Sequence, residues 1–129
     1  MRVLLDTHVI IWALTEPQKL SAIARSLIEN RGNVLLASAA SAWEIGTKYR
    51  LGKLPLLEAT VLNYQSQLTR LGTEELNVTT SHALLAGQLT WAHGDPFDRM
   101  LAAQAMLESV PLVTGDTVFS TLDGVEVLW

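Results

Sequence analysis

The sequence predicts an α/β fold, a three-layer α/β/α sandwich with a mainly parallel sheet. Short apolar segments of strand length recur along the chain, and segments with helical periodicity and capping residues separate them. Buried strands of parallel sheets read as continuous apolar runs, and helices usually connect them. The whole chain, residues 1–129, is expected to form a single domain, which is long enough to bury a core without disulfides.

The first part of the chain is expected to contain two strands and four helices. Residues 2–5 read as a buried strand. The apolar segment 8–14 fits a strand or a helix, and the helix is preferred because Asp6 or Thr7 can cap it and Pro17 lies beyond its end. The elements expected after it are a helix opened by Ser21 and closed by Gly32, a strand at 33–37, a helix from 41 to about 51 ended by Gly52, and a helix over 57–71 ended by Gly72.

The second part of the chain is expected to contain three strands and two helices. They are a short strand at 75–78, a helix over 80–91, a helix over 97–107 with good helix formers, and strands at 111–114 and 125–128. A turn-rich stretch at 93–96 separates the two helices. In open parallel sheets the ligand site lies beyond the carboxyl ends of the strands, so residues at these junctions are candidates for a site.

Four acidic residues stand where a strand or loop hands over to a helix, and they come from separate segments: Asp6, Glu44, Asp98 and Asp116. Bringing carboxylates together is unfavourable unless a cation or protons compensate their charge. If the fold converges them, a bound divalent metal is the plainest reason. Oxygen ligands without cysteine or a histidine pair favour Mg²⁺ or Mn²⁺ over zinc.

Each of these acids also has a local structural explanation. The alternatives are a helix cap for Asp6, a capping box from Ser41 to Glu44, a cap at Asp95 with Pro96 at the first helical position and Asp98 at the positive end of the dipole, and a turn role for Asp116. Ser, Thr or Asn would cap a helix equally well. Four carboxylates at one edge of one sheet therefore favour the metal site, and Asp95 can combine a cap with a role in the site.

Basic and hydroxyl residues beside the acids suggest supporting roles. Lys48 follows Glu44 by four residues, which is typical of a helical ion pair, or it belongs with Arg50 and Lys53 to a basic strip that meets phosphates. Three further candidates are Arg99, which can orient an acid or touch a phosphate, and Thr7 and Thr114, which can hydrogen-bond carboxylates or substrate.

Histidine and tryptophan residues carry weaker signals. The three histidines, His8, His82 and His93, have no metal-ligand spacing. His82 is expected on a helix surface, and His93 is expected to have a loop role near the acids. The tryptophans Trp12, Trp43 and Trp91 are expected in the core or at an interface rather than as base-stacking platforms.

Composition limits the classes of protein. The net charge of −4 argues against a protein that coats nucleic acid through bulk charge, but not against an enzyme that touches a few phosphates. The absence of cysteine excludes a disulfide framework and a thiolate metal site, and it is compatible with the cytoplasm. We expect no secretory signal and no transmembrane helix. The high apolar fraction, 49%, leans towards a second copy or a partner that covers part of the surface.

Four segments carry a resemblance to a known family. LLDTHVIIW at the start, SAWEIGTKYRLGKL in the middle, and DPFDRMLAAQA and LVTGD near the end resemble PIN-domain nucleases, and more narrowly the VapC-type toxins of bacterial toxin–antitoxin pairs. The resemblance covers essentially the whole chain, and the ordered set is more specific than any one segment. The family positions fall on Asp6, Glu44, Asp98 and Asp116, and all four are acidic here.

The resemblance implies a parallel sheet between helices and an acidic pocket for Mg²⁺ or Mn²⁺, with Asp6 and Asp98 as the principal metal ligands. It implies an endoribonuclease, often aimed at transfer RNA or ribosomal RNA, with a homodimer and a cognate VapB-type antitoxin as partners. Gly94 stands where relatives often carry a basic residue. The resemblance therefore does not decide whether that loop contacts RNA.

Two other classes of function stay open on the residues alone. Clustered carboxylates on an α/β sheet also serve metal-dependent phosphohydrolases that act on DNA or small phosphoesters. A non-catalytic binding module, with the acids acting only as caps, is the third reading.

Overall fold

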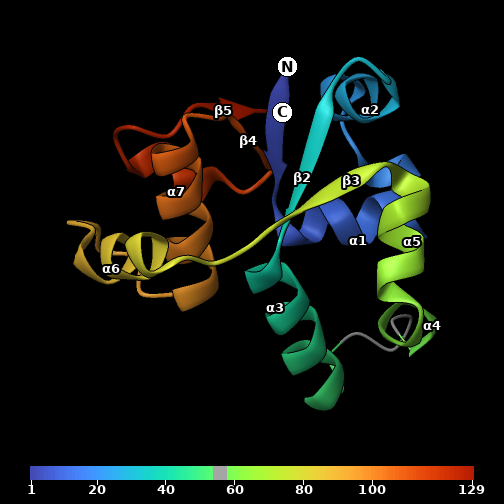
Figure 1. Cartoon of the computed structure of the whole chain (residues 1–129), viewed down its shortest axis with the longest axis horizontal. Helices are drawn as coiled ribbons and strands as arrows, with labels where there is room; N and C mark the ends of the chain where they lie inside the picture. The colour runs from blue at the N-terminus through green and yellow to red at the C-terminus, as the bar shows by residue number, and fades with distance from the viewer. Residues whose placement is uncertain (54–57) are drawn as a thin grey trace.

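A five-stranded parallel sheet forms the centre of the computed structural model, which describes residues 1–53 and 58–129 (Figure 1). The strand order is β3-β2-β1-β4-β5, and all four pairs are parallel. The strands are β1 (Arg2–Leu5), β2 (Val34–Ser38), β3 (Thr73–Leu76), β4 (Leu112–Val113) and β5 (Val127–Leu128). The predicted α/β fold with a mainly parallel sheet is confirmed.

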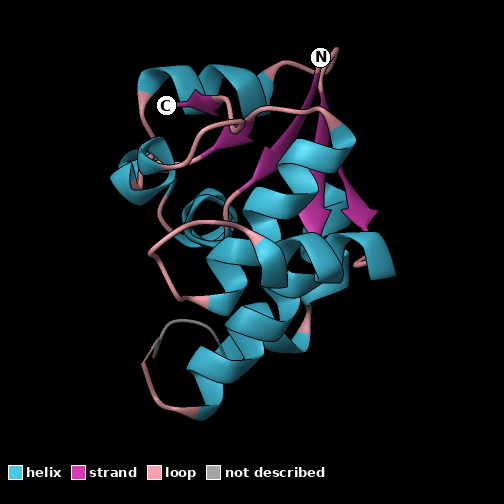
Figure 2. Cartoon of the chain, turned by 90° about the vertical axis from the view of Figure 1, so that its left-hand side faces the viewer, coloured by secondary structure: helices cyan, strands magenta, loops and turns pink. Residues whose placement is uncertain are grey.

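Helices cover both faces of this sheet (Figures 1 and 2). One face carries α1 (Thr7–Thr15), α2 (Ala22–Glu29) and α5 (Tyr64–Leu71), and the other carries α6 (Thr80–Gln88) and α7 (Pro96–Glu108). The helices α3 (Ala39–Arg50) and α4 (Glu58–Leu62) extend beyond the carboxyl ends of the strands, at the bottom of Figure 1. Short 3-10 turns, η1 (Pro17–Lys19) and η3 (Thr117–Thr121), complete the described elements.

Strand alternation divides the core into two layers. In β1, Leu4 packs with the α7 side and Val3 and Leu5 pack with the α1 side, and all three are fully buried. Leu4 lies between Leu36 of β2 and Leu112 of β4 in the sheet. The apolar strands therefore place the carboxyl ends of β1 and β4 next to each other, with residues 6 and 114–116 directly beyond them.

The observed elements differ from the expected ones mainly at their ends. The helix expected over 57–71 is two helices, because Asn63 leaves the helical conformation (φ −122°, ψ 26°) between α4 and α5; its expected start at Leu57 lies outside the described residues. The strand expected at 75–78 is β3, which begins at Thr73 directly after the left-handed Gly72. The helix expected over 80–91 ends at Gln88.

The helix expected from 41 begins at Ala39, because the hydroxyl of Ser38 accepts from the backbone N–H of Ala40 and caps it. Strand β2 thus passes into α3 without a loop. The helix opened by Ser21 ends at Glu29 with Asn30 as its C-cap, so the stop expected at Gly32 is wrong. The remaining predicted elements lie within two residues of their observed bounds. In the described part of the chain, no helix has the length and apolar character needed to cross a membrane.

Candidate functional site

An acidic pocket of about 230 Å³ lies at the carboxyl edge of the sheet. It contains five carboxylates from four parts of the chain, and its lining is Asp6, Thr7, His8, Glu44, Lys48, Asp95, Asp98 and Asp116. Asp6 follows β1, Glu44 lies in α3, Asp95 and Asp98 begin α7, and Asp116 precedes η3. The structure therefore brings together the four acids that the sequence singled out.

Asp6 is buried and held from three directions. One carboxylate oxygen, Oδ1, accepts from the backbone N–H of Thr7 at 2.7 Å, which is the cap of α1. The other oxygen, Oδ2, accepts from the Thr114 hydroxyl at 2.6 Å and lies 3.2 Å from His8 Nδ1. The Thr114 hydroxyl in turn accepts from the backbone N–H of Asp116 at 3.0 Å. Cap and site roles thus coincide at Asp6, and Thr114 connects it to the loop of Asp116.

His8 connects the same two loops through its imidazole ring. The backbone N–H of Gly115 donates to His8 Nε2 at 3.2 Å, so this nitrogen is unprotonated and the ring proton of neutral His8 lies on Nδ1, facing Asp6. The ring packs edge-on against Trp12, with centroids 4.7 Å apart, and lies 6.2 Å from Trp129. His8 was not singled out from the sequence, because it has no ligand spacing.

Gly115 is a close-approach position in this arrangement. A Cβ added there would lie 2.9 Å from Cε2 of the Trp129 indole, which is too close for any side chain. The indole of Trp129 therefore packs against one side of the exposed Gly115, and only glycine fits there without a shift of the ring. Asp116 itself is exposed, and its Oδ1 accepts from the backbone N–H of Val118 to cap η3.

Glu44 is a buried carboxylate, and only one of its two oxygens has a partner among the described residues. Its Oε2 forms an ion pair with Lys48 Nζ at 2.7 Å, which confirms the helical pair expected at this spacing. Its Oε1 is buried and has no hydrogen-bond partner among the described residues. The capping box predicted from Ser41 to Glu44 is wrong, because Ser38 caps the helix two residues earlier and the Ser41 hydroxyl is hydrogen-bonded to that of Thr7 at 2.9 Å. Thr7 thus fastens α3 to α1.

Asp98 lies in the first turn of α7, where Asp95 caps the helix by accepting from the backbone N–H of Phe97 and of Asp98. Burial raises the pKa of Asp98 from 3.8 to about 6, and repulsion from Asp95, Asp6 and Glu44 adds to the effect. A hydrogen bond with His93, with Nε2 2.7 Å from Oδ2, opposes this rise in the pKa of Asp98. His93 therefore belongs to the site through Asp98.

Of the two roles suggested for Arg99, orientation of an acid is wrong for the described residues, and contact with a phosphate stays a prediction. Its guanidinium donates to four backbone carbonyls, those of Ala86, Leu89, Trp91 and His93, at 2.6 to 3.0 Å. It is not among the described residues that line the acidic pocket. The side chain closes the end of α6 and holds the irregular segment that carries His93, so its influence on Asp98 passes through that segment.

The expectation for His82 is also wrong. The ring is buried, with 2% of its surface exposed, and it accepts from the backbone N–H of Thr79 through Nδ1. Its Nε2 lies 3.1 Å from Glu108 Oε1 on α7. The residue therefore joins α6 to α7 and lies outside the acidic pocket.

The pocket suits a hard cation by its donor set. It offers carboxylate oxygens, and the buried Glu44 Oε1 has a lone pair that no described donor satisfies. Within residues 1–53 and 58–129, no group of three or more acidic or histidine side chains is arranged to hold an ion as it stands. The donor chemistry fits a divalent metal, and ligation by three side chains requires rotation of at least one of them.

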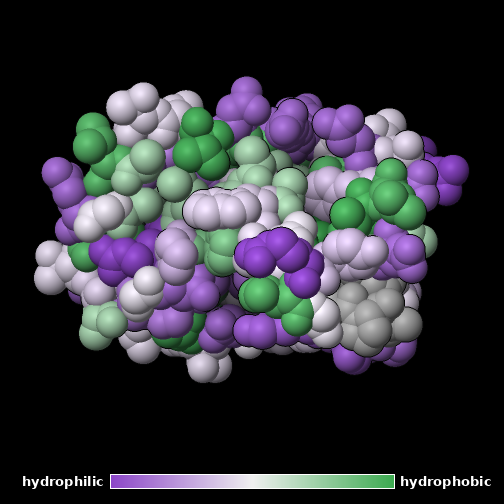
Figure 3. All heavy atoms as spheres, turned by 90° about the horizontal axis from the view of Figure 1, so that it is seen from below, coloured by the Kyte–Doolittle hydropathy of each residue, from purple (hydrophilic) through white to green (hydrophobic). Residues whose placement is uncertain are grey.

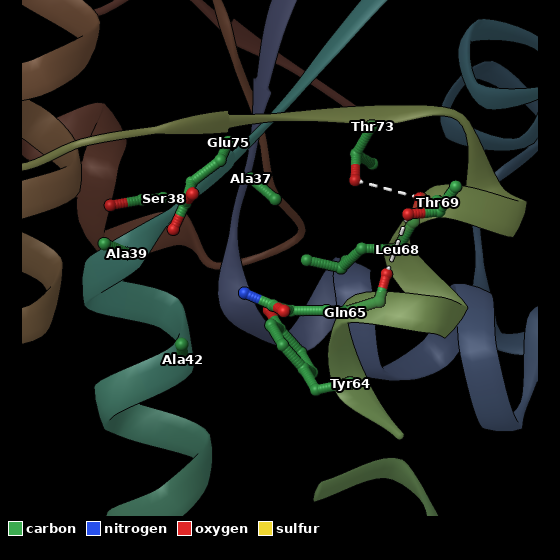
Figure 4. Close-up of a pocket in the computed structure, with 10 residues that line it drawn as sticks. All are labelled: Ala37, Ser38, Ala39, Ala42, Tyr64, Gln65, Leu68, Thr69, Thr73 and Glu75. Carbon is green, nitrogen blue, oxygen red and sulfur yellow. Dashed lines mark hydrogen bonds between the residues drawn. The ribbon is translucent and has the colours of Figure 1, made fainter. Parts of the chain in front are cut away.

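A second, larger cavity lies on the other side of α3 (Figure 4). Its volume is about 310 Å³, and it lies between α3, α5 and the ends of β2 and β3. Glu75 is its only carboxylate among the described lining residues. Burial, together with the charge of Glu75, raises the pKa of Tyr64 to about 12, so this phenol stays neutral. The clustered charge that a metal requires is in the smaller acidic pocket instead.

The sequence matches the PIN domain family model over residues 3–125. The chain therefore belongs to the PIN-domain family. Ribonuclease VapC22 of Mycobacterium tuberculosis (strain ATCC 25618 / H37Rv) is 36% identical over 116 residues, which cover 88% of this chain and 86% of that protein. Ribonuclease VapC16 of the same organism is 43% identical over 58 residues, and this match covers 45% of this chain and 41% of that protein.

Solved structures of similar fold are toxin–antitoxin complexes. The DNA-bound VapBC of Salmonella typhimurium matches with a TM-score of 0.70 at 21% identity, over 99% of this chain and 97% of that chain. VapBC2 of Rickettsia felis, bound to a DNA fragment from its promoter, matches with a TM-score of 0.69 at 18% identity, over 99% and 98%. At these identities the likeness concerns the fold, which agrees with the family assignment.

Proposed function

We propose that this chain is a metal-dependent endoribonuclease, the VapC-type toxin of a type II toxin–antitoxin pair. The observation that carries the proposal is the buried Oε1 of Glu44, which has no partner among the described residues and shares its pocket with four other carboxylates. Such an arrangement is costly in the free protein and is relieved by a cation. Membership in the PIN-domain family, and relatives named as ribonucleases, support the reaction class.

Asp6 and Asp98 are the proposed principal ligands of the metal, directly or through water, and Glu44 and Asp116 complete the acidic cluster. Mg²⁺ is the proposed ion, with Mn²⁺ as the alternative, because all the acidic ligands offer oxygen and the described residues include no cysteine. The chemistry that such an ion supplies when bound is activation of water and neutralisation of charge on the attacked phosphate.

Other residues in the pocket and directly beside it position these acids. Thr114 and His8 hold Asp6 by hydrogen bonds to Oδ2, which leaves its orientation little freedom. His93 holds Asp98 in the same way. Lys48 lines the pocket beside Glu44. Its ammonium can exchange the ion pair with this carboxylate for an ion pair with a substrate phosphate. Asp95 combines its cap role with a place in the pocket lining.

The proposed substrate is cellular RNA, with transfer RNA or ribosomal RNA as the expected targets. Hydrolysis by in-line attack of water would leave a 5′-phosphate and a 3′-hydroxyl. A cognate VapB-type antitoxin is the proposed protein partner, and a homodimer the proposed assembly of the chain. The antitoxin would cover apolar surface and place a basic side chain in the acidic pocket, where the local charge favours it.

The test is cleavage of purified RNA by the purified chain. We expect cleavage with Mg²⁺ or Mn²⁺, none with a chelator, and none with Asp98→Asn at equal protein concentration. Asp123→Asn is the matched control, because Asp123 is exposed and outside the lining of the pocket. Turnover of bis(p-nitrophenyl) phosphate without cleavage of RNA would favour the phosphohydrolase, and equal RNA cleavage by Asp98→Asn would refute the assignment of the site.

A further inference from the structure

We propose that Trp43, on the exposed side of α3, is a stacking platform for an unpaired base of the substrate, and that Arg50 contacts a phosphate farther along the same helix. This inference rests on the proposed ribonuclease function and deepens it, because it assigns a binding subsite for single-stranded RNA beside the acidic pocket. The sequence-based expectation placed Trp43 in the core or at an interface and not in a base-stacking platform, and the exposure of its side chain is the reason for this different inference.

Trp43 is a large apolar side chain left in solvent, with 63% of its surface exposed. Its indole is nevertheless held in place, because it packs edge-on against Phe97 with ring centroids 4.7 Å apart and an angle of 76° between the planes. In an edge-to-face pair, each ring keeps at least one face free of the other ring, so Trp43 can accept another partner. A fixed aromatic ring with open surface is the feature on which single-stranded nucleic acids stack.

The position of this aromatic pair ties it to the acids. Trp43 immediately precedes Glu44 on α3, and Phe97 immediately precedes Asp98 on α7. Both acids line the pocket and the two rings do not, so the ring pair joins α3 to α7 one residue before each acid. A base stacked on Trp43 would therefore belong to a nucleotide close to the phosphate that the pocket receives.

Further exposed residues follow Trp43 on the same side of α3, namely Gly46 and Arg50. Residues three, four and seven positions later, Gly46, Thr47 and Arg50, lie on the same side of the helix. A Cβ at Gly46 would meet nothing within 4 Å, so packing does not require glycine at this place. Glycine in the middle of a helix is unfavourable. Space for a base beside the indole would explain why the chain has glycine at this position.

Basic residues at and just beyond the carboxyl end of α3 indicate the kind of partner. Three of the nine Lys and Arg residues of the chain, Lys48, Arg50 and Lys53, lie within six positions, although the chain has a net charge of −4. The seven-residue step from Trp43 to Arg50 spans about 10 Å along the helix axis. That length matches about three stacked nucleotides.

Seen from below, hydrophilic and hydrophobic residues adjoin on this face of the molecule (Figure 3). Lys48 is paired with Glu44 in the pocket, whereas Arg50 lies on the Trp43 side of α3 and Lys53 follows the end of the helix. An exposed aromatic ring on the same helix side as an exposed cation matches a polyanion with exposed bases. The core of a protein interface is instead depleted of charged residues, so a second copy or an antitoxin fits this strip less well.

The experiment measures RNA binding without cleavage, using the Asp98→Asn chain in Mg²⁺ and a fluorescein-labelled single-stranded RNA. We expect Trp43→Ala to weaken binding about tenfold and Trp43→Phe to weaken it much less. Leu84→Ala, which shortens a side chain of similar exposure on α6, is the matched control and should leave binding unchanged.

A set of RNAs that each lack one base locates the contact. At the stacked position, loss of the base should weaken binding by the parent chain, and Trp43→Ala should add no further loss there. At all other positions the two losses should multiply. If Trp43→Ala weakens binding to every abasic RNA equally, or has no effect at all, the stacking platform is refuted.

Gly46→Leu gives an independent readout, since it covers the open place beside the indole while adding a better helix former. We expect weaker RNA binding with an unchanged or raised melting temperature. If Trp43→Ala instead dissociates a dimer in light scattering and leaves RNA affinity unchanged, the strip is an interface between copies. Failure of the wild-type chain to cleave RNA would refute the proposed function, whereas intact cleavage with no Trp43 effect refutes only this inference.

Discussion

The most direct energetic consequence of the acidic pocket is that Asp98→Asn should stabilise the metal-free protein at neutral pH. The pKa of Asp98 is raised from 3.8 to about 6 in the folded chain by burial and by repulsion from neighbouring acids. One pKa unit corresponds to about 1.4 kcal/mol, so the charged form costs the fold about 3 kcal/mol. The side chain is only 16% exposed, so little of this is screened by solvent.

The net gain from Asp98→Asn is smaller than that figure. The His93 ring loses its charged partner at 2.7 Å, and charge-assisted hydrogen bonds are the stronger ones. We therefore expect the free energy of unfolding to rise by about 1–2 kcal/mol at pH 7.5 in a chelator. Urea denaturation followed by circular dichroism measures it, and Asp123→Asn, an exposed acid outside the pocket lining, should change it by less than about 0.5 kcal/mol.

The pH dependence has a definite sign. Because the folded pKa of Asp98 is raised, the folded chain binds more protons than the unfolded chain between pH 3.8 and about 6. Wild-type stability therefore falls over this window as pH rises, relative to Asp98→Asn. The advantage of the Asn variant should be absent below pH 3.8 and complete above pH 6. A constant advantage across the window, or a less stable variant at pH 7.5, would refute the account of Asp98.

Three further predictions concern the supports of the pocket. Arg99→Lys should lower the free energy of unfolding by about 2 kcal/mol or more in urea and reduce RNA cleavage, because an ammonium cannot serve four carbonyls at once; unchanged stability would contradict the role given to the guanidinium. Gly115→Ala should lower the melting temperature, since its Cβ would lie 2.9 Å from the Trp129 indole, and should be much less harmful in a Trp129→Ala background; equal losses in both backgrounds would argue against the contact. His8→Ala should weaken Mn²⁺ binding measured by calorimetry, with partial rescue by His8→Asn, which keeps a donor towards Asp6; equal Mn²⁺ affinity in all three chains would remove His8 from the site.

Much of this architecture follows from sequence pattern because parallel strands and helices have strong local signals. Asp6 and Asp116 were identifiable because each comes at or just after the end of an apolar strand, and the carboxyl ends of parallel strands meet at one edge. Asp98 was identifiable as an acid in the first turn of a helix, and Glu44 as an acid near the expected start at residue 41, although it lies in the middle of α3. The break at Asn63 had no comparable signal, because asparagine in a helical pattern is only mildly unfavourable.

Thr114 was predicted to hydrogen-bond a carboxylate and does so with Asp6. The other supports of the site escaped prediction because their partners are distant or irregular. His8 bonds to Gly115, 107 residues later, and His93 reaches Asp98 only because the loop before α7 folds back. The role of Arg99 depends on carbonyls of an irregular segment, which no periodicity describes. The residue types and their places in the sequence thus identified the acids of the pocket. The tertiary structure was needed to show which side chains hold these acids in position.

The central claim is tested most directly by mapping RNA 5′ ends in cells briefly induced for the wild-type chain and in cells induced for Asp98→Asn. We expect discrete new 5′-phosphate ends only with the wild-type chain, at positions that also name the target RNA. Identical maps from the two strains, with both proteins folded and equally abundant, would contradict a metal-dependent endoribonuclease that uses Asp98.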